Sequence, residues 1–98
     1  MTIESQHRMP VDGSAKPDVL RRLAYIEGHL NGVRRMIEED QYCVDVLKQT
    51  YAVRRAIEKL EARILETHLQ GCVVEGIKEG REEEVIGELI DLYEVAGR

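Results

Sequence analysis

The stretch that decides the fold is a long run without glycine or proline, residues 43–70, CVDVLKQTYAVRRAIEKLEARILETHLQ. Glycine and proline are the residues that most disfavour the interior of a helix. Within the run, one stripe of side chains recurs at alternating spacings of three and four, which is typical of a helix that buries one face. The pattern predicts one unbroken helical rod whose stripe consists of Cys43, Val46, Thr50, Val53, Ile57, Leu60, Ile64 and His68.

A second helix is predicted before this rod. It begins near Pro17, a residue suited to a first helical turn. Its apolar seam stops at Ile37 and consists of Val19, Leu23, Ile26, Leu30, Val33 and Ile37. We expect a short turn to follow before Tyr42. Gly28 and Gly32 lie inside the seam at a cost in helix propensity, so we expect them to mark a close contact between helices.

A third, shorter helix is predicted from about Glu82 to Tyr93, with three glutamates at its electropositive start. Residues 1–15 have no periodicity and are expected to form a flexible tail, so the predicted domain covers residues 16–98. A helical domain within 98 residues has only a thin core. We therefore expect an all-α protein that completes its burial by self-association.

Composition and charge exclude several classes of protein. No apolar run approaches the roughly 20 residues that span a bilayer, and the N-terminus lacks the apolar core of a secretory signal. We expect a soluble, cytoplasmic protein without a membrane partner, whose cysteines are thiols with a metal or redox role. The net charge of −5 argues against indiscriminate nucleic-acid binding. Residues 16–63 nevertheless hold ten bases against eight acids, so a locally basic face is compatible with the sequence, as is a merely solvated surface.

Three potential metal ligands lie along the rod and just after it. His68 and Cys72 are four positions apart, so on a helix they point the same way and can chelate one ion. Cys43 is twenty-five positions before His68, roughly 37 Å along a helix, which is too far for a shared ion within one chain. Two rods packed antiparallel about an axis near Ala56 and Ile57 would bring Cys43 of one chain beside His68 and Cys72 of the other. Two thiolates and an imidazole suit Cu(I), or zinc with a fourth ligand; ordinary packing roles for these residues remain open on spacing alone.

The sequence RRLAYIEGHLNGVRRMIEEDQYCVDVLKQTYAVRRAIEKL, followed by HLQGCV and IGELID, resembles the copper-sensing repressors of the CsoR family over roughly residues 17–93. The resemblance implies a Cu(I) site made by Cys43 of one protomer with His68 and Cys72 of the other. It also implies that Tyr42 and Glu88 lie around these ligands. The implied assembly is an antiparallel four-helix-bundle homodimer, two of which form a homotetramer.

The resemblance further implies a repressor that binds operator double-stranded DNA without metal and releases it on binding Cu(I). The chain has no helix-turn-helix or zinc-finger pattern, so the DNA surface is expected to be a general helical face. Arg22 and Lys59 match basic positions that the family uses for DNA, and Arg54 and Arg55 are added because they are close to Lys59 in sequence. For the last two, solvation and pairing along the helix, such as Arg54 with Glu58, are equally compatible with the sequence.

Other functions remain to be weighed. A related sensor of another metal or of reactive sulfur is one alternative, although His68 argues against the persulfide branch, which lacks that histidine. A non-regulatory helical protein that buffers copper would share the ligands but would not need basic helical faces. An enzyme is not expected, because the chain offers no substrate cleft or oxyanion loop for Cys72 and His68 to serve.

Overall fold

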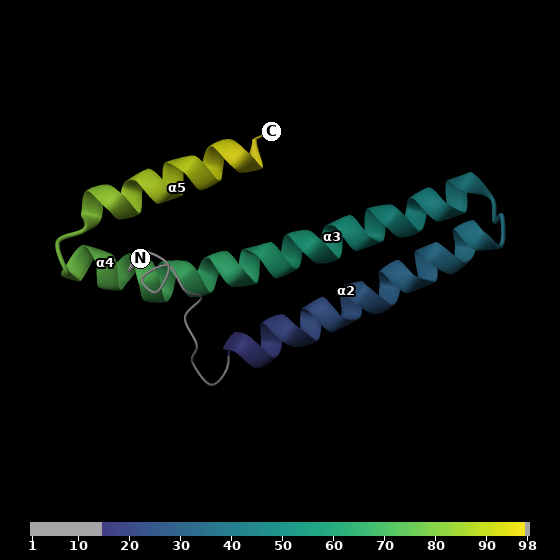
Figure 1. Ribbon diagram of the computed structural model, residues 1–98, viewed down its shortest axis with the longest axis horizontal. Coiled ribbons are helices and arrows are strands. Elements are labelled where there is room, and N and C mark those ends of the chain that lie inside the picture. Colours follow the sequence, from purple (N-terminus) through teal and green to yellow (C-terminus); the bar gives the residue numbers. More distant parts are fainter. Residues whose placement is uncertain (1–14, 98) are drawn as a thin grey trace. The chain divides into compact units, whose positions relative to one another are not determined.

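The structure is a computed structural model that describes residues 15–97. Within that range it contains helices and turns and no strand, which confirms the predicted all-α class. The tail expected over residues 1–15 lies outside the described residues, except for Ala15, which is the first residue of the first helix. Figure 1 labels the helices α2 (Ala15–Glu38), α3 (Cys43–His68), α4 (Val74–Lys78) and α5 (Glu82–Ala96), and a π-helical turn, η1 (Leu69–Val73), joins α3 to α4.

The described chain divides into two compact units, one ending at Leu65 and the other beginning at Glu66. The first unit is a helical hairpin in which α2 and the body of α3 run side by side in opposite directions (Figure 1). Its turn lies where the sequence predicts it, between Glu38 and Cys43. Asp40 has a φ of 56°, in the left-handed region that aspartate tolerates better than most residues, and this conformation allows the chain to reverse.

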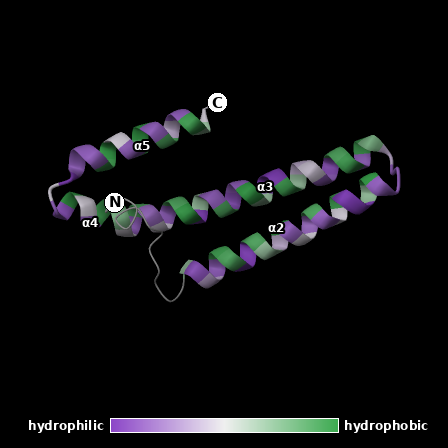
Figure 2. Cartoon of the chain, in the orientation of Figure 1, coloured by the Kyte–Doolittle hydropathy of each residue, from purple (hydrophilic) through white to green (hydrophobic). Residues whose placement is uncertain are grey.

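The hairpin has a small core. Ile26, Val33 and Val53 form its buried cluster, and Val46, Ala56 and Leu60 pack against them. On α2, the buried positions are thus only part of the predicted seam, since the intervening members Leu23, Leu30 and Ile37 are 40%, 48% and 59% exposed. Figure 2 accordingly shows apolar and polar patches alternating along both helices. One chain leaves part of its apolar seam uncovered.

The second unit begins with the last turn of α3. The rod that the sequence predicts through Gln70 remains helical but changes type at Leu69, where the π-helical turn begins, and the helical run then continues to Lys78. A π-turn inside an α-helix is rare and costs hydrogen-bond regularity. Gly71 lies within this turn, and glycine favours the α-helix less than any residue except proline, so the α-helical hydrogen-bond pattern is weakened here.

A tight turn at Gly80 connects α4 to α5. Gly80 has a φ of 79°, which glycine adopts without steric cost. The two helices approach closely, since a Cβ placed on Gly76 would lie 2.5 Å from Cγ2 of the buried Val85. The close contact expected at Gly28 and Gly32 is absent within the described residues, because a Cβ at either would have no heavy atom within 4 Å. The glycine that the packing requires is therefore Gly76.

Candidate metal and DNA-binding sites

The three predicted metal ligands lie at the two ends of the rod. Cys43 is the first residue of α3 and is exposed, whereas His68 is its last residue and is half-buried. Cys72 follows within the π-helical turn and is also half-buried, and both cysteines are free thiols. Among residues 15–97 of one chain, no three histidine, cysteine or carboxylate side chains form a group that could hold a metal ion. A site shared between two chains stays a prediction.

The donor set itself fits a soft monovalent ion. Thiolate sulfur favours Cu(I) and zinc, and imidazole nitrogen suits both metals; three such ligands are enough for Cu(I), whereas zinc would need a fourth. Around His68 and Cys72 the chain is well packed, because Thr67 and Val73 are only 5% and 8% exposed. The π-helical turn begins directly after His68 and includes Cys72, so the α-helical geometry assumed from their spacing does not hold there. Their mutual orientation depends on the π-turn.

Tyr42 and Glu88, expected around the ligands, have different surroundings. Tyr42 lies in the turn immediately before α3 and is 67% exposed. Glu88 lies on α5 and is half-buried. In the same unit as Glu88, Arg81 donates hydrogen bonds from Nη2 and Nε to Oε1 of Glu79, at 2.7 and 3.1 Å. These bonds raise the pKa of Arg81, and the charges of Glu84 and Glu88 raise it further, so Glu88 lies within the field of this guanidinium.

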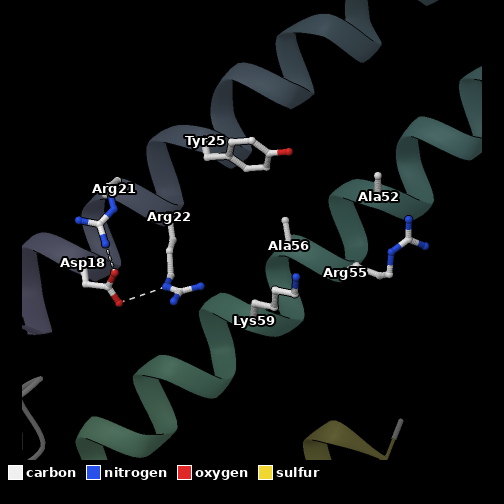
Figure 3. Close-up of a pocket in the computed structure, with 8 residues that line it drawn as sticks. All are labelled: Asp18, Arg21, Arg22, Tyr25, Ala52, Arg55, Ala56 and Lys59. Carbon is white, nitrogen blue, oxygen red and sulfur yellow. Dashed lines mark hydrogen bonds and ion pairs between the residues drawn. The ribbon is translucent and has the colours of Figure 1, made fainter.

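A basic pocket lies between α2 and α3 within the hairpin. Its volume is about 630 Å³, and Figure 3 shows Arg22 extending from α2 toward α3, on which Lys59 and Ala56 lie. Four cationic side chains and one carboxylate line it, which makes the pocket a place where an anion is attracted. The lining residues are Asp18, Arg21, Arg22, Tyr25, Ala52, Arg55, Ala56 and Lys59.

Asp18 is the centre of the polar contacts at this pocket. Its Oδ2 accepts hydrogen bonds from Nε of Arg22 at 3.1 Å and from Nε of Arg63 at 3.0 Å, and its Oδ1 accepts one from Arg21. The contact with Arg63 joins α2 to α3. The hydrogen bonds from Arg22 and Arg63 lower the pKa of Asp18 from the ordinary value of an aspartate, so the carboxylate is ionised at neutral pH.

The three arginines and one lysine predicted to bind DNA do not all lie in the same place. Arg22, Lys59 and Arg55 line the pocket, and Arg54 does not. The guanidinium carbon of Arg54 instead lies 4.9 Å from the centroid of the Tyr51 ring, a cation–π contact.

The sequence analysis missed Asp18 and Arg21, which line the pocket, and Arg63, which reaches Asp18 from α3. The spacing of Asp18 with Arg21 and Arg22, three and four positions apart, is a local signal that would have found two of them. Arg63 is forty-five positions from Asp18, so no local pattern indicates it.

Comparison with known proteins gives one consistent result. A family described as metal-sensitive transcriptional repressor matches residues 15–94. A Bacillus subtilis protein named copper-sensing transcriptional repressor CsoR is 41% identical over 78 residues, covering 80% of this chain and 77% of that protein. A Mycobacterium ulcerans protein of the same name is 43% identical over 76 residues, which are 78% of this chain but only 65% of that protein, slightly under two thirds of its length.

The fold is also similar to that of a solved structure. The crystal structure of the copper-sensing repressor CsoR with Cu(I) from Geobacillus thermodenitrificans superposes with a TM-score of 0.87 at 32% identity, covering 94% of this chain and 96% of that one. Separately, none of the helices within residues 15–97 is both long and apolar enough to cross a membrane.

Proposed function

Because this chain belongs to the family of metal-sensitive transcriptional repressors, we propose that it is a Cu(I)-responsive repressor, which binds operator DNA without metal and releases it when Cu(I) binds. The observation that carries the proposal is the donor set of Cys43, His68 and Cys72. Relatives at 41% and 43% identity are named copper-sensing repressors, and the superposed structure is a Cu(I) complex. We further infer that the protein regulates without catalysing a reaction and acts in the cytoplasm.

The proposed metal site is formed by Cys43 of one protomer with His68 and Cys72 of the other. One helix begins at Cys43 and ends at His68, so the two residues cannot share an ion within the same rod. A two-fold axis creates two equivalent sites, giving one Cu(I) per protomer. Both thiols must lose their protons to bind, so affinity for Cu(I) should fall as pH is lowered.

The proposed assembly is an antiparallel four-helix-bundle homodimer, two of which form a homotetramer. Its support is the apolar surface that the hairpin leaves exposed. Leu23, Leu30 and Ile37 of α2 continue the same seam as its buried residues, and Ile57 and Ile64 of α3 are each 37% exposed. Taking such a side chain from full exposure to full burial stabilises by about 1.5–3 kcal/mol, and these side chains, which are already partly buried, would each contribute a fraction of that.

The proposed DNA surface includes the pocket between α2 and α3. Arg22, Lys59 and Arg55 would face phosphates of double-stranded DNA, while Arg54 would contribute from the neighbouring surface of α3. Since such contacts neutralise phosphates and release counterions, affinity should fall steeply as salt rises. The C-terminal segment from Glu75 onward is rich in acids and should lie away from the duplex.

Regulation requires that binding of Cu(I) weakens binding of DNA. If Cu(I) prefers the conformation that cannot bind DNA, then DNA must weaken Cu(I) binding by the same factor. One ring nitrogen of His68 would bind the metal, and the other N–H would be directed to Tyr42 or Glu88, which would tie the metal site to the helices that carry them.

The test is a Cu(I) titration with and without DNA. The metal-free protein selects a duplex from a random pool, and binding of that duplex is followed as Cu(I) is added under reducing conditions. We expect one Cu(I) per protomer, sulfur-dominated X-ray absorption, and release of the duplex. Copper binding without any effect on DNA would identify a copper buffer, and four nitrogen or oxygen neighbours with no sulfur would refute the proposed ligands.

A further inference from the structure

We infer that Asp18 is a positioning residue for DNA binding: it holds Arg22 by its Nε atom, so that the Nη groups of this arginine are set for a backbone phosphate at the pocket between α2 and α3. The inference rests on the proposed DNA-binding function. It adds to that function a residue which touches no DNA itself and acts through a neighbouring arginine.

Arg22 uses different atoms for its contact with Asp18 and for the proposed contact with phosphate: Nε for the first and the Nη groups for the second. Arg22 donates to Oδ2 of Asp18 through Nε, so this hydrogen bond does not use the Nη hydrogens of that arginine. The same oxygen accepts from Nε of Arg63 on α3, which fixes the carboxylate between the two helices. Side-chain exposure rises outward, from 16% for Asp18 and 24% for Arg63 to 41% for Arg22. Asp18 is therefore shielded from solvent, whereas Arg22 remains accessible to DNA.

Phosphate recognition explains why such an arrangement matters. A guanidinium binds a phosphate through paired N–H donors in a fixed fork, and a free arginine side chain must lose much rotamer freedom to align that fork. An arginine already held at Nε has lost this freedom before DNA arrives. Pre-organisation of this kind raises affinity without a new contact to the ligand.

The positive charges around Asp18 outnumber its single negative charge. Three guanidiniums, of Arg21, Arg22 and Arg63, hydrogen-bond to this one carboxylate. Arg55 and Lys59 line the same pocket, and Asp18 is the one carboxylate among its lining residues. A phosphate approaching the pocket therefore meets an excess of positive charge, and loss of the carboxylate should harm binding by releasing Arg22 more than it helps by removing repulsion.

The test compares Asp18→Asn with Glu27→Gln, which removes one charge from an exposed position on the same helix. We expect Asp18→Asn to bind the selected duplex about tenfold more weakly, because a neutral amide oxygen holds the guanidinium of Arg22 less strongly than a carboxylate does. Its plot of log affinity against log salt should become shallower by about one unit, as for the loss of one phosphate contact. Glu27→Gln should bind as tightly as the unsubstituted protein, or slightly more tightly.

A double-mutant cycle separates positioning from general weakening of the fold. In the background of Arg22→Gln, adding Asp18→Asn should cause little further loss, because the arginine that it positions is gone. Arg63→Gln breaks the same link between α2 and α3 but keeps the contact of Asp18 with Arg22. It should lower the melting temperature, with the salt dependence of DNA binding retained.

Asp18→Asn binding as tightly as Glu27→Gln, or additive losses in the cycle, would overturn the inference while leaving the proposed function intact. If the unsubstituted metal-free protein binds no duplex, the proposed function fails and this inference fails with it.

Discussion

Nε2 of His29 on α2 lies 2.8 Å from Oε1 of Gln49 on α3, a polar contact that crosses the hairpin beside its apolar core. Since the amide oxygen can only accept, Nε2 of His29 carries the hydrogen. The other ring nitrogen, Nδ1, is buried without a hydrogen-bond partner among the described residues. The ring of Tyr25 meets the imidazole edge-on, with centroids 5.8 Å apart. Gln49 is therefore the one side chain shown to hydrogen-bond this histidine within residues 15–97.

Gln49→Met should destabilise the protein. Methionine keeps the approximate volume of glutamine but its thioether sulfur is only a weak acceptor, so a partly buried donor is left poorly satisfied, at a cost of about 1–3 kcal/mol. Urea denaturation at fixed protomer concentration measures the change, since stability of an oligomer depends on concentration. Lys48→Met, at the exposed neighbouring position, is the control and should change stability by less than about 0.5 kcal/mol. Equal stability of the two variants would show that the His29–Gln49 contact contributes nothing.

Gly76→Ala should destabilise the packing of α4 on α5. The added methyl would lie 2.5 Å from Cγ2 of Val85, which is 3% exposed and has little room to move. Overpacking of this kind costs about 1–3 kcal/mol, more than the gain of up to about 1 kcal/mol in helix propensity. Gly87→Ala, on α5 with open space around it, should by contrast be neutral or stabilising. Thermal denaturation of both variants decides the matter, and a stabilised Gly76→Ala protein would mean that α5 shifts freely.

Most of the helical boundaries could be predicted from the sequence, because they depend on local signals. The end of the apolar seam at Ile37 marks the turn before α3, and a run of three glutamates marks the start of α5 at Glu82. The π-helical turn at Leu69–Val73 was not predictable, since it differs from an α-turn by one hydrogen-bond step and leaves no periodic pattern. The tight contact at Gly76 was missed for a related reason, because sequence shows that a glycine is present but not which helix approaches it.

The basic pocket could be predicted only in part. Arg22 and Lys59, chosen by family match, both line it, and of the two arginines chosen by nearness in sequence, Arg55 lines it and Arg54 does not. Position along a helix decides which face a side chain occupies, and neighbours in sequence lie about 100° apart. Arg63 reaches Asp18 from a distant part of the chain, which only the folded hairpin reveals.

Acidification should remove the stabilising contribution of Asp18. Hydrogen bonds from Arg22 and Arg63 lower its pKa in the folded protein below the value of about 3.9 found in unfolded chains. A lowered folded pKa stabilises the fold above the unfolded pKa, and this stabilisation is lost as pH falls through about 4 toward the folded value. The difference in unfolding free energy between the unsubstituted protein and Asp18→Asn should therefore be constant near neutral pH and shrink in acid. A difference that grows on acidification has the wrong sign for this account.

Mixing two defective proteins should restore metal sites if the ligands come from two chains. A Cys43→Ala chain keeps the His68 and Cys72 half of a site, and a chain with both His68→Ala and Cys72→Ala keeps the other half. Each alone should bind Cu(I) poorly, whereas their heterodimer should contain one complete site and one empty one. Competition with a Cu(I) chelator measures the recovery, with subunit exchange confirmed by mass spectrometry. No recovery after confirmed exchange would contradict a shared site.

The last prediction concerns how Cu(I) binding reaches the DNA surface. If the N–H of His68 opposite the metal is directed to Tyr42 or Glu88, these residues transmit the signal without binding the ion. Tyr42→Phe with Glu88→Ala should then leave Cu(I) affinity nearly unchanged but reduce the coupling free energy, which is typically 1–3 kcal/mol between two linked sites. Cys43→Ala should instead abolish Cu(I) binding itself.

Coupling is measured as the ratio of DNA affinities with and without saturating Cu(I), and independently as the ratio of Cu(I) affinities with and without DNA. The two ratios must agree, because linkage is reciprocal, so they check each other. Glu83→Ala removes a carboxylate from the exposed first turn of α5 and serves as the control for charge. If the Tyr42→Phe, Glu88→Ala protein still releases DNA with the full coupling of the control, the signal passes from the metal to the helices through Cys43, His68 and Cys72 alone.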